Sequence, residues 1–333
     1  MRKRIPKILI TGGAGFIGSH FVKEAVSKGF KVVVVDKLSY CADLKRLESI
    51  KGKYKFYKTD ICKKLEIESI FAREKPDYVV NFAAESHVDR SIQSSGVCVK
   101  TNVLGTHVLL DCAKMYKVKK FIHTSTDEVY GQIEKGKFRE TDSLQPRSPY
   151  SASKAAADCL VKSYVSTYNF PAIIVRPSNN YGPWQYPEKF MPVVIYKALA
   201  GERVPVYGRG KNKREWLYVL DCVKAISLIL DKGKIGQIYN VGSREEKENK
   251  EVAEDVLKKI GKPENLIQFV KDRPGHDFRY SLNCDKIKKL GWKSNNTFNQ
   301  GLDKTIGWYQ GNQKWLNRKA KSLKSYWKKV YKP

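Results

Sequence analysis

Short apolar runs alternate with amphipathic segments along the first half of the chain. The run KVVVVD at 31–36 is apolar at consecutive positions, which is typical of a strand buried on both faces. Alternation of such strands with helices predicts an α/β fold with a Rossmann-type, doubly wound parallel sheet, which binds ligands at the carboxyl ends of its strands. We expect strands at 7–13, 31–36, 54–61, 77–85 and 119–126, and helices at 18–29, 66–75 and 101–116.

The pattern changes after Pro177, where loops rich in Pro, Gly and Tyr alternate with helical segments such as 251–261. This change predicts a smaller C-terminal α/β lobe that binds the substrate over the open edge of the sheet. We therefore expect a Rossmann domain at 1–176 that carries the catalytic residues. A lobe at 177–311 is expected to be mainly substrate-binding, with some segments returning to the Rossmann core, and a basic tail follows at 312–333.

The tail combines apolar and basic positions. Trp315, Leu316, Leu323, Trp327 and Val330 recur at roughly helical spacing, among eight Lys or Arg residues and no acid. A basic amphipathic helix can rest on an anionic membrane or partner. It can also pack on its own protein through its aromatic side, and we favour this second interpretation.

Composition excludes several classes of protein. The 333 residues are 41% hydrophobic and 29% charged, and no stretch approaches the ~20 apolar residues that span a bilayer. The N-terminal apolar run leads into a glycine loop without a small-residue cleavage site, which favours a strand over a signal peptide. Seven scattered cysteines without a C-x-x-C pair indicate neither a disulfide framework nor a metal site. We expect a soluble protein of the reducing cytoplasm.

The net charge is strongly positive. The chain has 63 basic and 34 acidic residues, a formal charge of +29. Such a field attracts phosphates of any kind, including nucleotides, nucleic acid and anionic lipid heads. A general lysine bias on a solvated surface explains the same excess, and the even spread of lysines along the chain favours that explanation.

A glycine-rich turn at the mouth of the first helix indicates a dinucleotide site. Gly12, Gly15 and Gly18 follow the first strand, and glycine permits a close approach between the backbone and a pyrophosphate at the helix N-terminus. Asp36 ends the second strand, where its carboxylate can accept hydrogen bonds from the adenosine ribose. Because this acid repels a 2′-phosphate, the pattern favours NAD over NADP, whereas the adjacent Lys37 opposes that preference.

A second motif indicates proton transfer. Tyr150 and Lys154 lie four residues apart in YSASK and hence on one helical face. An ammonium near a phenol is expected to lower the phenol pKa, which produces a base that can take a hydroxyl proton. Upstream, Ser125 and Thr126 can hold a sugar hydroxyl.

The stretch TSTDEVYG at 124–131 also places two acids, Asp127 and Glu128, directly after an apolar run. Neighbouring side chains of a regular strand point to opposite faces of the sheet. The two carboxylates can therefore share one site only if the backbone turns out of the strand at this point.

Together these motifs make the chain resemble the extended short-chain dehydrogenase/reductases, and within them the dTDP-glucose 4,6-dehydratase family. The resemblance extends from Lys7 to about Tyr309, and the TDE, YPEK and DRPGH motifs are its most selective parts. It is carried by TGGAGFIGS, DKLSY, NFAAESHVDRSI, TNVLGTHVLL, STDEVYG, PYSASKAAAD, NNYGPWQYPEKFMP, REWLYV, YNVGS and DRPGHDFRYSLNCDKIKKLGW.

The resemblance implies an NAD-dependent lyase that oxidises C4 of a nucleotide-linked glucose, eliminates water across C5 and C6, and returns the hydride to C6. By resemblance Tyr150 takes the C4 hydroxyl proton, Glu128 removes the C5 proton and protonated Asp127 donates to the leaving oxygen. Two close carboxyls in a dry pocket resist ionising together, which raises one pKa. Thr126 is expected to hydrogen-bond the sugar near C4.

The resemblance also implies two sets of binding residues and a homodimer formed through the long helices beginning near Thr101 and Tyr150. Arg214 and Arg273 are the expected diphosphate clamps, since a guanidinium can donate two parallel bonds to phosphate oxygens. For NAD the implied residues are Gly12, Gly15, Phe16, Ile17, Gly18, Asp36, Lys37, Asp60, Ile61, Ala83, Ala84, Ser86, Thr101, Tyr150, Lys154 and Asn180. For the substrate they are His87, Thr126, Asn179, Lys189, Phe190, Pro205, Tyr207, Arg214, Asn249, Arg273 and His276.

Two positions depart from the family pattern. Cys222 stands where histidine is common, and Glu215 stands where aspartate usually follows the clamp arginine. The sequence leaves UDP-glucose open as an alternative nucleotide sugar. A UDP-sugar 4-epimerase or decarboxylase, an NAD-binding scaffold and a nucleic-acid-associated protein are further alternatives. The adjacent acids argue against an epimerase, which needs no such pair for elimination.

Overall fold

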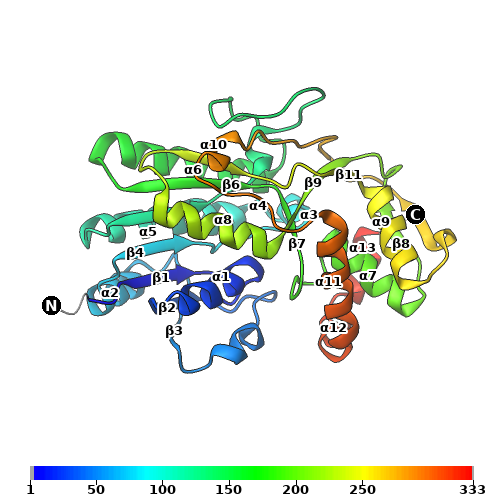
Figure 1. Cartoon of the computed structure of the whole chain (residues 1–333), viewed down its shortest axis with the longest axis horizontal. Helices are drawn as coiled ribbons and strands as arrows, with labels where there is room; N and C mark the ends of the chain where they lie inside the picture. The colour runs from blue at the N-terminus through cyan, green and yellow to red at the C-terminus, as the bar shows by residue number, and fades with distance from the viewer. Residues whose placement is uncertain (1–3, 332–333) are drawn as a thin grey trace.

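A seven-stranded parallel sheet lies at the centre of the computed structural model, which describes residues 4–331 (Figure 1). Its order places β1 between β4 and β2, so the chain winds outward in both directions from this point. Ligands of doubly wound sheets bind where the winding reverses. In spatial order the strands are β10 (Ile238–Val241), β6 (Ala172–Pro177), β5 (Lys120–Thr124), β4 (Tyr78–Asn81), β1 (Lys7–Thr11), β2 (Lys31–Asp36) and β3 (Tyr54–Lys58).

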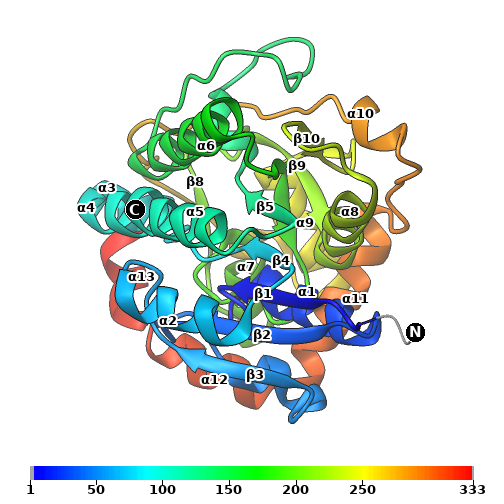
Figure 2. The same cartoon turned by 90° about the vertical axis from the view of Figure 1, so that its left-hand side faces the viewer.

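Helices cover both faces of this sheet, as Figure 2 shows, which confirms the predicted fold class. One face carries α2 (Lys64–Glu74), α5 (Gly105–Met115) and α6 (Pro149–Tyr168), and the other carries α1 (Phe16–Ser27) and α8 (Val219–Lys232). The segment expected to be a regular helix from 101 begins instead as the π-helical turn η2 (Val99–Leu104), before α5. Shorter elements are η1 (Leu44–Ile50), α3 (Val88–Gln93), α4 (Ser95–Cys98) and η3 (Asp127–Tyr130).

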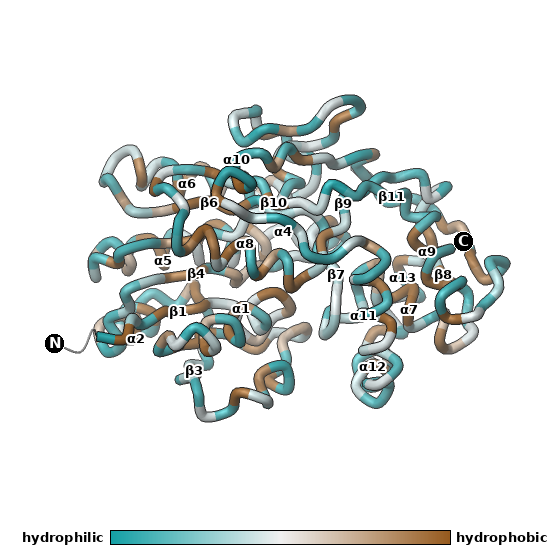
Figure 3. Tube along the Cα trace, viewed as in Figure 1, coloured by the Kyte–Doolittle hydropathy of each residue, from teal (hydrophilic) through white to brown (hydrophobic). Residues whose placement is uncertain are grey.

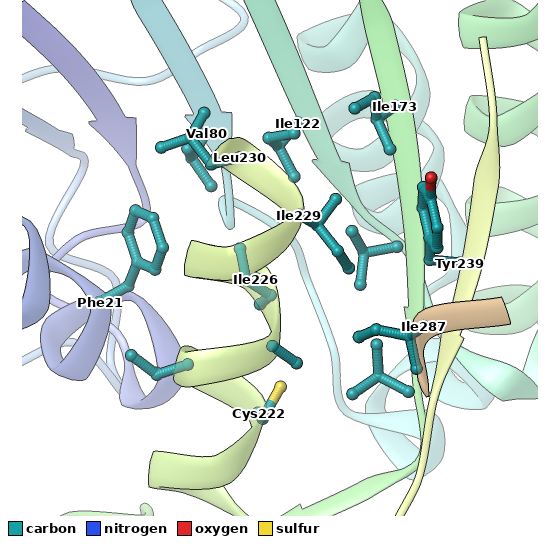
Figure 4. Close-up of a cluster of buried hydrophobic side chains, with 14 of the residues drawn as sticks. Phe21, Val80, Ile122, Ile173, Cys222, Ile226, Ile229, Leu230, Tyr239 and Ile287 are labelled. Atoms are coloured by element: carbon teal, nitrogen blue, oxygen red, sulfur yellow. The ribbon is translucent and has the colours of Figure 1, made fainter. Parts of the chain in front are cut away.

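Apolar side chains fill the space between the sheet and α8. The central strands are apolar along their length, whereas the surface loops are hydrophilic (Figure 3). Ile226 and Ile229 of α8 pack against Ile122 and Ile173 of the sheet (Figure 4). Cys222 belongs to this cluster and is fully buried, and burial raises the pKa of its thiol to about 12. The departure at 222 therefore places a small apolar side chain in the core.

The second lobe contains two small sheets and helices that pack on them. One sheet has the order β11 (Glu246–Glu248), β9 (Lys213–Tyr218), β7 (Asn179–Tyr181), and the other pairs β8 (Val204–Tyr207) with β12 (Ile267–Val270). Before the C-terminal segment, the helical elements of this lobe are α7 (Phe190–Ala200), α9 (Asn249–Ile260), η4 (Glu264–Leu266) and α11 (Phe298–Gly311). The short helix α10 (Asp285–Lys288) packs instead against β10 of the central sheet. Between β9 and β11 the chain returns to the central sheet through α8 and β10.

The C-terminal segment forms α12 (Gln313–Lys321) and α13 (Lys324–Val330). Trp315, Leu316 and Trp327 are buried in the apolar cluster of the second lobe, and most of the lysines face outward. The Nε1 atom of Trp315 donates to Asp43 Oδ2 at 2.9 Å, and Lys319 Nζ lies 2.9 Å from the same oxygen. The last residues of the predicted tail, Lys332 and Pro333, lie outside the described residues.

We predict that the contact of α12 with Asp43 contributes stability that depends on pH. Burial alone raises the pKa of Asp43, but hydrogen bonds from Lys319 and Trp315 outweigh it and lower the pKa from 3.8 to about 2. The stabilisation is therefore complete above pH 3.8 and is lost as the pH falls towards about 2. In urea denaturation, Asp43→Asn should be less stable than the parent protein at neutral pH, and the two should converge near the folded-state pKa. A difference that stays constant with pH would contradict this origin.

Within residues 4–331 no helix combines the length and apolar character needed to cross a membrane. The same residues contain no group of His, Cys, Asp and Glu side chains placed to hold a metal ion. All seven cysteines have free thiols.

Candidate active site

The backbone turns immediately after β5, and this turn brings the two adjacent acids into one cavity. Strand β5 ends at Thr124, and Thr126, with φ of −155°, is the N-cap of the short helix η3. Its hydroxyl accepts from the backbone N–H of Glu128 at 3.3 Å and donates to Asp127 Oδ1 at 3.2 Å. Both acids consequently line the same cavity, of about 280 Å³, instead of pointing to opposite faces.

The two carboxyls have different electrostatic environments. Burial, and next the negative charge of Glu128, raise the pKa of Asp127 well above its ordinary value. Burial also raises the pKa of Glu128, but Arg273, Lys189 and Arg214 oppose that shift. Asp127 therefore holds a proton more readily, and Glu128 is the carboxyl that ionises more easily.

Tyr150 and Lys154 enter this cavity from the start of α6. Ser148 caps the helix in a reciprocal bond with Ser151, so the first turn is firmly placed. The expected lowering of the Tyr150 pKa by Lys154 is not found. Burial and the charge of Glu128 raise the Tyr150 pKa, and a hydrogen bond with Thr126 only partly opposes them. Lys154 Nζ donates to Thr124 O at 2.6 Å, and burial lowers the pKa of Lys154 to about 8.

Buried oxygens without partners concentrate along this cavity. A buried polar atom is costly unless it is hydrogen-bonded, so such a concentration indicates that a polar ligand completes the site. Along this cavity, the buried side-chain oxygens without a partner among the described residues are those of Thr124 (Oγ1), Ser125 (Oγ), Asp127 (Oδ2), Ser178 (Oγ), Asn179 (Oδ1), Asn180 (Oδ1) and Gln185 (Oε1).

The glycine-rich turn fits a dinucleotide pyrophosphate. Gly12 has φ of +66°, and a Cβ added there would lie 2.6 Å from the backbone nitrogen of Ala83. A Cβ on Gly18 would lie 2.2 Å from Gly12 O. The turn thus needs glycine for its own close packing, and it ends at Gly15, the N-cap of α1, where a helix N-terminus can hold a phosphate.

The end of β2 fits the adenosine ribose of NAD better than a 2′-phosphate. Asp36 accepts from the N–H groups of Ala14 at 3.0 Å and Leu38 at 2.8 Å, which hold its carboxylate at the cavity end of the strand. Lys37 Nζ is engaged by acids, 2.8 Å from Glu85 Oε1 and 3.7 Å from Asp60 Oδ2. The lysine that opposed the NAD preference is therefore neutralised.

Ten of the predicted cofactor residues line this cavity and six do not. Those at the cavity are Gly12, Gly15, Phe16, Ile17, Gly18, Ala84, Ser86, Tyr150, Lys154 and Asn180. Those not at the cavity are Asp36, Lys37, Asp60, Ile61, Ala83 and Thr101. Of these, Asp60 and Thr101 contact Lys37, the residue after Asp36 at the end of β2.

A second cavity, of about 130 Å³, adjoins the first. Glu128, Asn179, Lys189 and Phe190 are among the residues that line both cavities, so Glu128 lies where the two meet, whereas Asp127 lines the first alone. The predicted substrate residues that line the second cavity are His87, Asn179, Lys189, Phe190, Pro205, Tyr207, Arg214, Asn249, Arg273 and His276, while Thr126 lines the first.

Two guanidiniums line the second cavity, that of buried Arg214 and that of partly buried Arg273. Arg214 lies with its Cζ 4.3 Å from the Tyr280 ring centroid and donates to Asp277 O at 2.7 Å. Arg273 Nη1 lies 3.4 Å from Asp89 Oδ1, and its buried Nε has no partner among the described residues. The cavity therefore offers donors to an anionic ligand.

The Glu215 departure has a structural role. Its carboxylate accepts from the backbone N–H groups of Arg244 at 2.5 Å and Leu282 at 3.1 Å, and the side chain is fully buried. A Cβ on Gly242 would lie 2.2 Å from Glu215 Oε1, so the longer acid relies on that glycine.

Sequence reasoning missed several residues of these cavities, including Arg46, Glu188 and Tyr331. Arg46 lines the first cavity, Tyr331 lines the second, and Glu188 lines both. Glu188 lies inside the quoted YPEK motif and accepts from Tyr40 at 2.8 Å and Arg90 at 3.0 Å, so the motif was an available signal for it. Arg46 and Tyr331 had no local signal, because only the folded chain brings them to the site.

Comparison with known proteins places this site in context. Residues 9–305 match the family model for GDP-mannose 4,6 dehydratase. A dTDP-glucose 4,6-dehydratase of Xanthomonas campestris pv. campestris is 47% identical, with 92% of this chain and 94% of that protein covered. The crystal structure of the dTDP-glucose 4,6-dehydratase DesIV from Streptomyces venezuelae with NAD bound is 40% identical, with a TM-score of 0.90 over 93% of this chain and 98% of that one.

The fold is also shared with an epimerase. The UDP-glucose 4-epimerase of Thermus thermophilus, in complex with NAD, is 31% identical with a TM-score of 0.87, over 92% of this chain and 99% of that one. The backbone fold alone therefore does not distinguish a dehydratase from an epimerase, and the distinction has to come from the side chains of the site.

Proposed function

The chain belongs to the dTDP-glucose 4,6-dehydratase family of NAD-dependent lyases, and we propose that it converts dTDP-glucose to dTDP-4-keto-6-deoxyglucose and water at the cavity of Asp127 and Glu128. The observation that carries this proposal is the pair of carboxyls with unequal pKa values, buried in one cavity with Tyr150. An elimination needs an acid and a base at once, and such a pair supplies both.

Each side chain has a distinct proposed task. Tyr150, with Thr126 beside it, acts as a phenolate that takes the proton of the C4 hydroxyl and becomes a neutral phenol, and the cationic Lys154 stabilises the phenolate before this transfer. The chemistry that NAD brings to this site is reversible hydride transfer, and its oxidised ring also adds a positive charge. Glu128 then removes the C5 proton, and Asp127 gives its proton to the departing C6 hydroxyl, so that one water leaves.

The second cavity is proposed to hold the nucleotide. Arg214 and Arg273 are placed to bind the diphosphate, since both guanidiniums line this cavity. Pro205, Tyr207 and His276 line the same cavity, and the rings of Tyr207 and His276 lie 6.0 Å apart, so we propose that the base stacks there. Lys189 and Asn179, which line both cavities, are suited to the sugar between them.

A product assay tests the proposal. The purified protein should convert dTDP-glucose to a product lighter by one water, detected by mass spectrometry, and should act more slowly on UDP-glucose. A product of unchanged mass would indicate an epimerase instead. Faster turnover of UDP-glucose would transfer the assignment to that nucleotide sugar.

We also propose a homodimer that works in the reducing cytoplasm. Apolar side chains along α4, η2 and α5 are about half exposed, namely Val97, Val99, Leu104 and Met115 at 46 to 55%. Exposed apolar side chains gathered along neighbouring helical elements are typical of a subunit contact. Sedimentation should give about twice the monomer mass, and the free thiols are compatible with a reducing compartment.

A further inference from the structure

Arg46 is a buried cation beside the glycine-rich turn. It lies in η1, is 1% exposed, and its guanidinium donates to backbone carbonyls from three separate segments. Nη1 donates to Ala14 O at 2.7 Å and to Cys41 O at 2.8 Å, while Nη2 and Nε donate to Trp184 O at 2.9 and 3.1 Å. These carbonyls belong to the glycine-rich turn, to the loop after β2 and to the loop after β7.

The positive charge of Arg46 has no counter-ion among the described residues. Asp36 and Asp43 are its nearest acids, yet neither lies within the 4.0 Å of an ion pair with it. Carbonyls satisfy hydrogen-bond donors but do not neutralise charge, and a buried unpaired charge is costly. The four bonds above also leave one of the five guanidinium N–H groups unused.

The position of Arg46 shows which anion can supply that counter-charge. Its side chain lines the same cavity as Gly15 and Phe16, and it bonds to the carbonyl of Ala14, directly before the N-cap of α1. The N-cap makes no side-chain hydrogen bond, and no acid lies in the first turn of α1. This is the place where a dinucleotide pyrophosphate is held in Rossmann folds.

We propose that Arg46 is a cofactor-binding residue of this chain: its guanidinium carries the positive charge opposite the NAD pyrophosphate and ties the glycine-rich turn to the loop at Trp184. The inference rests on NAD as the cofactor and is independent of the sugar chemistry. It goes beyond the glycine-rich motif, which contains no cation. The loop at Trp184 continues to Glu188 and Lys189, so one side chain joins the cofactor site to the substrate site.

Competition binding isolates the diphosphate contribution. NADH bound to the full-length protein is displaced with ADP or with adenosine, and the fall in NADH fluorescence gives the affinity of each competitor. The measurement is made on the parent protein, on Arg46→Gln and on Arg46→Lys. Adenosine lacks the diphosphate, so the loss of a charge contact with the diphosphate should weaken the binding of ADP alone. Arg46→Gln should weaken ADP by about tenfold or more, the loss of one buried charge-assisted contact, and change adenosine by less than about twofold. Arg46→Lys should keep most of the ADP preference.

The matched control is Lys45→Gln, which removes a neighbouring exposed charge and should leave both affinities unchanged. If Arg46→Gln lowered the affinities for ADP and for adenosine equally, Arg46 would have a purely structural role and the proposal would be overturned. An unchanged affinity for ADP would also overturn it. If Arg46→Gln does not fold, Arg46→Lys provides the test. A tenfold fall in the ratio of ADP affinity to adenosine affinity in this variant, which keeps the positive charge, would refute the assignment. Failure of the sugar reaction in the parent protein would leave these binding results standing, so the two proposals are tested separately.

Discussion

Replacing Glu128 by glutamine should trap the enzyme after the first oxidation, so that NADH absorbance builds up when dTDP-glucose is added. Glutamine keeps the size of the side chain but cannot remove the C5 proton, and loss of a positioned base lowers turnover by about 10²- to 10⁴-fold. Tyr150 and Lys154 remain in place, so oxidation at C4 should still occur. Stopped-flow absorbance measures the NADH, and mass spectrometry measures the dehydrated product.

The control for this prediction is Glu134→Gln, which changes an exposed acid a few residues away and should leave turnover unaffected. Full turnover in Glu128→Gln would remove Glu128 from its role. If Glu128→Gln were inactive and accumulated no NADH, Glu128 would be needed for the oxidation step, which would also contradict its assignment as the base of the elimination. Only accumulation without dehydration matches a base that acts after the hydride has left the sugar.

Replacing Trp327 by alanine should lower the free energy of unfolding by about 3–5 kcal/mol, the usual cost of deleting a large buried aromatic side chain. Trp327 of α13 is 4% exposed, its ring lies 5.2 Å from that of Tyr196, and Lys197 Nζ lies 5.1 Å above it. The C-terminal segment is therefore part of the apolar cluster of the second lobe. Urea denaturation measures the loss.

Lys328→Ala supplies the matched comparison, because it alters the next residue, which is exposed, and surface changes usually stay within about 0.5 kcal/mol. If Trp327→Ala cost as little as Lys328→Ala, α13 would be a detachable segment. The basic face of the tail would then be its main feature, and binding to anionic vesicles would become the relevant measurement.

Local patterns were enough to predict the central sheet and much of the site. Gly12, Gly15 and Gly18 lie within one turn, and the backbone shape that they permit depends on neighbours in sequence. The pairing of Tyr150 and Lys154 was also predictable from local sequence, since helical spacing alone puts the two residues on one face. From the sequence, Asp127 and Glu128 could share one site only if the backbone turned out of the strand. The structure has this turn, because Thr126 caps the short helix η3 directly after β5.

The remaining features depend on contacts between distant parts of the chain. Arg46 reaches Trp184 O across 138 positions, and Trp315 reaches Asp43 across 272, separations at which no spacing rule applies. The electrostatics of Tyr150 also escaped local reasoning. The spacing to Lys154 is correct, but burial and Glu128, set by the whole fold, decide the direction of the pKa shift.

The return of the chain to the central sheet between β9 and β11 limits how this enzyme can be re-engineered. Because α8 and β10 interrupt the second lobe in sequence, nucleotide recognition is not carried by one transplantable cassette. A chimaera that takes its base preference from a relative has to exchange the stretches 179–218, 246–270 and 298–330 together. A single crossover anywhere in the second half would join mismatched halves of the lobe, so recombination libraries should be built with paired junctions on either side of α8 and β10.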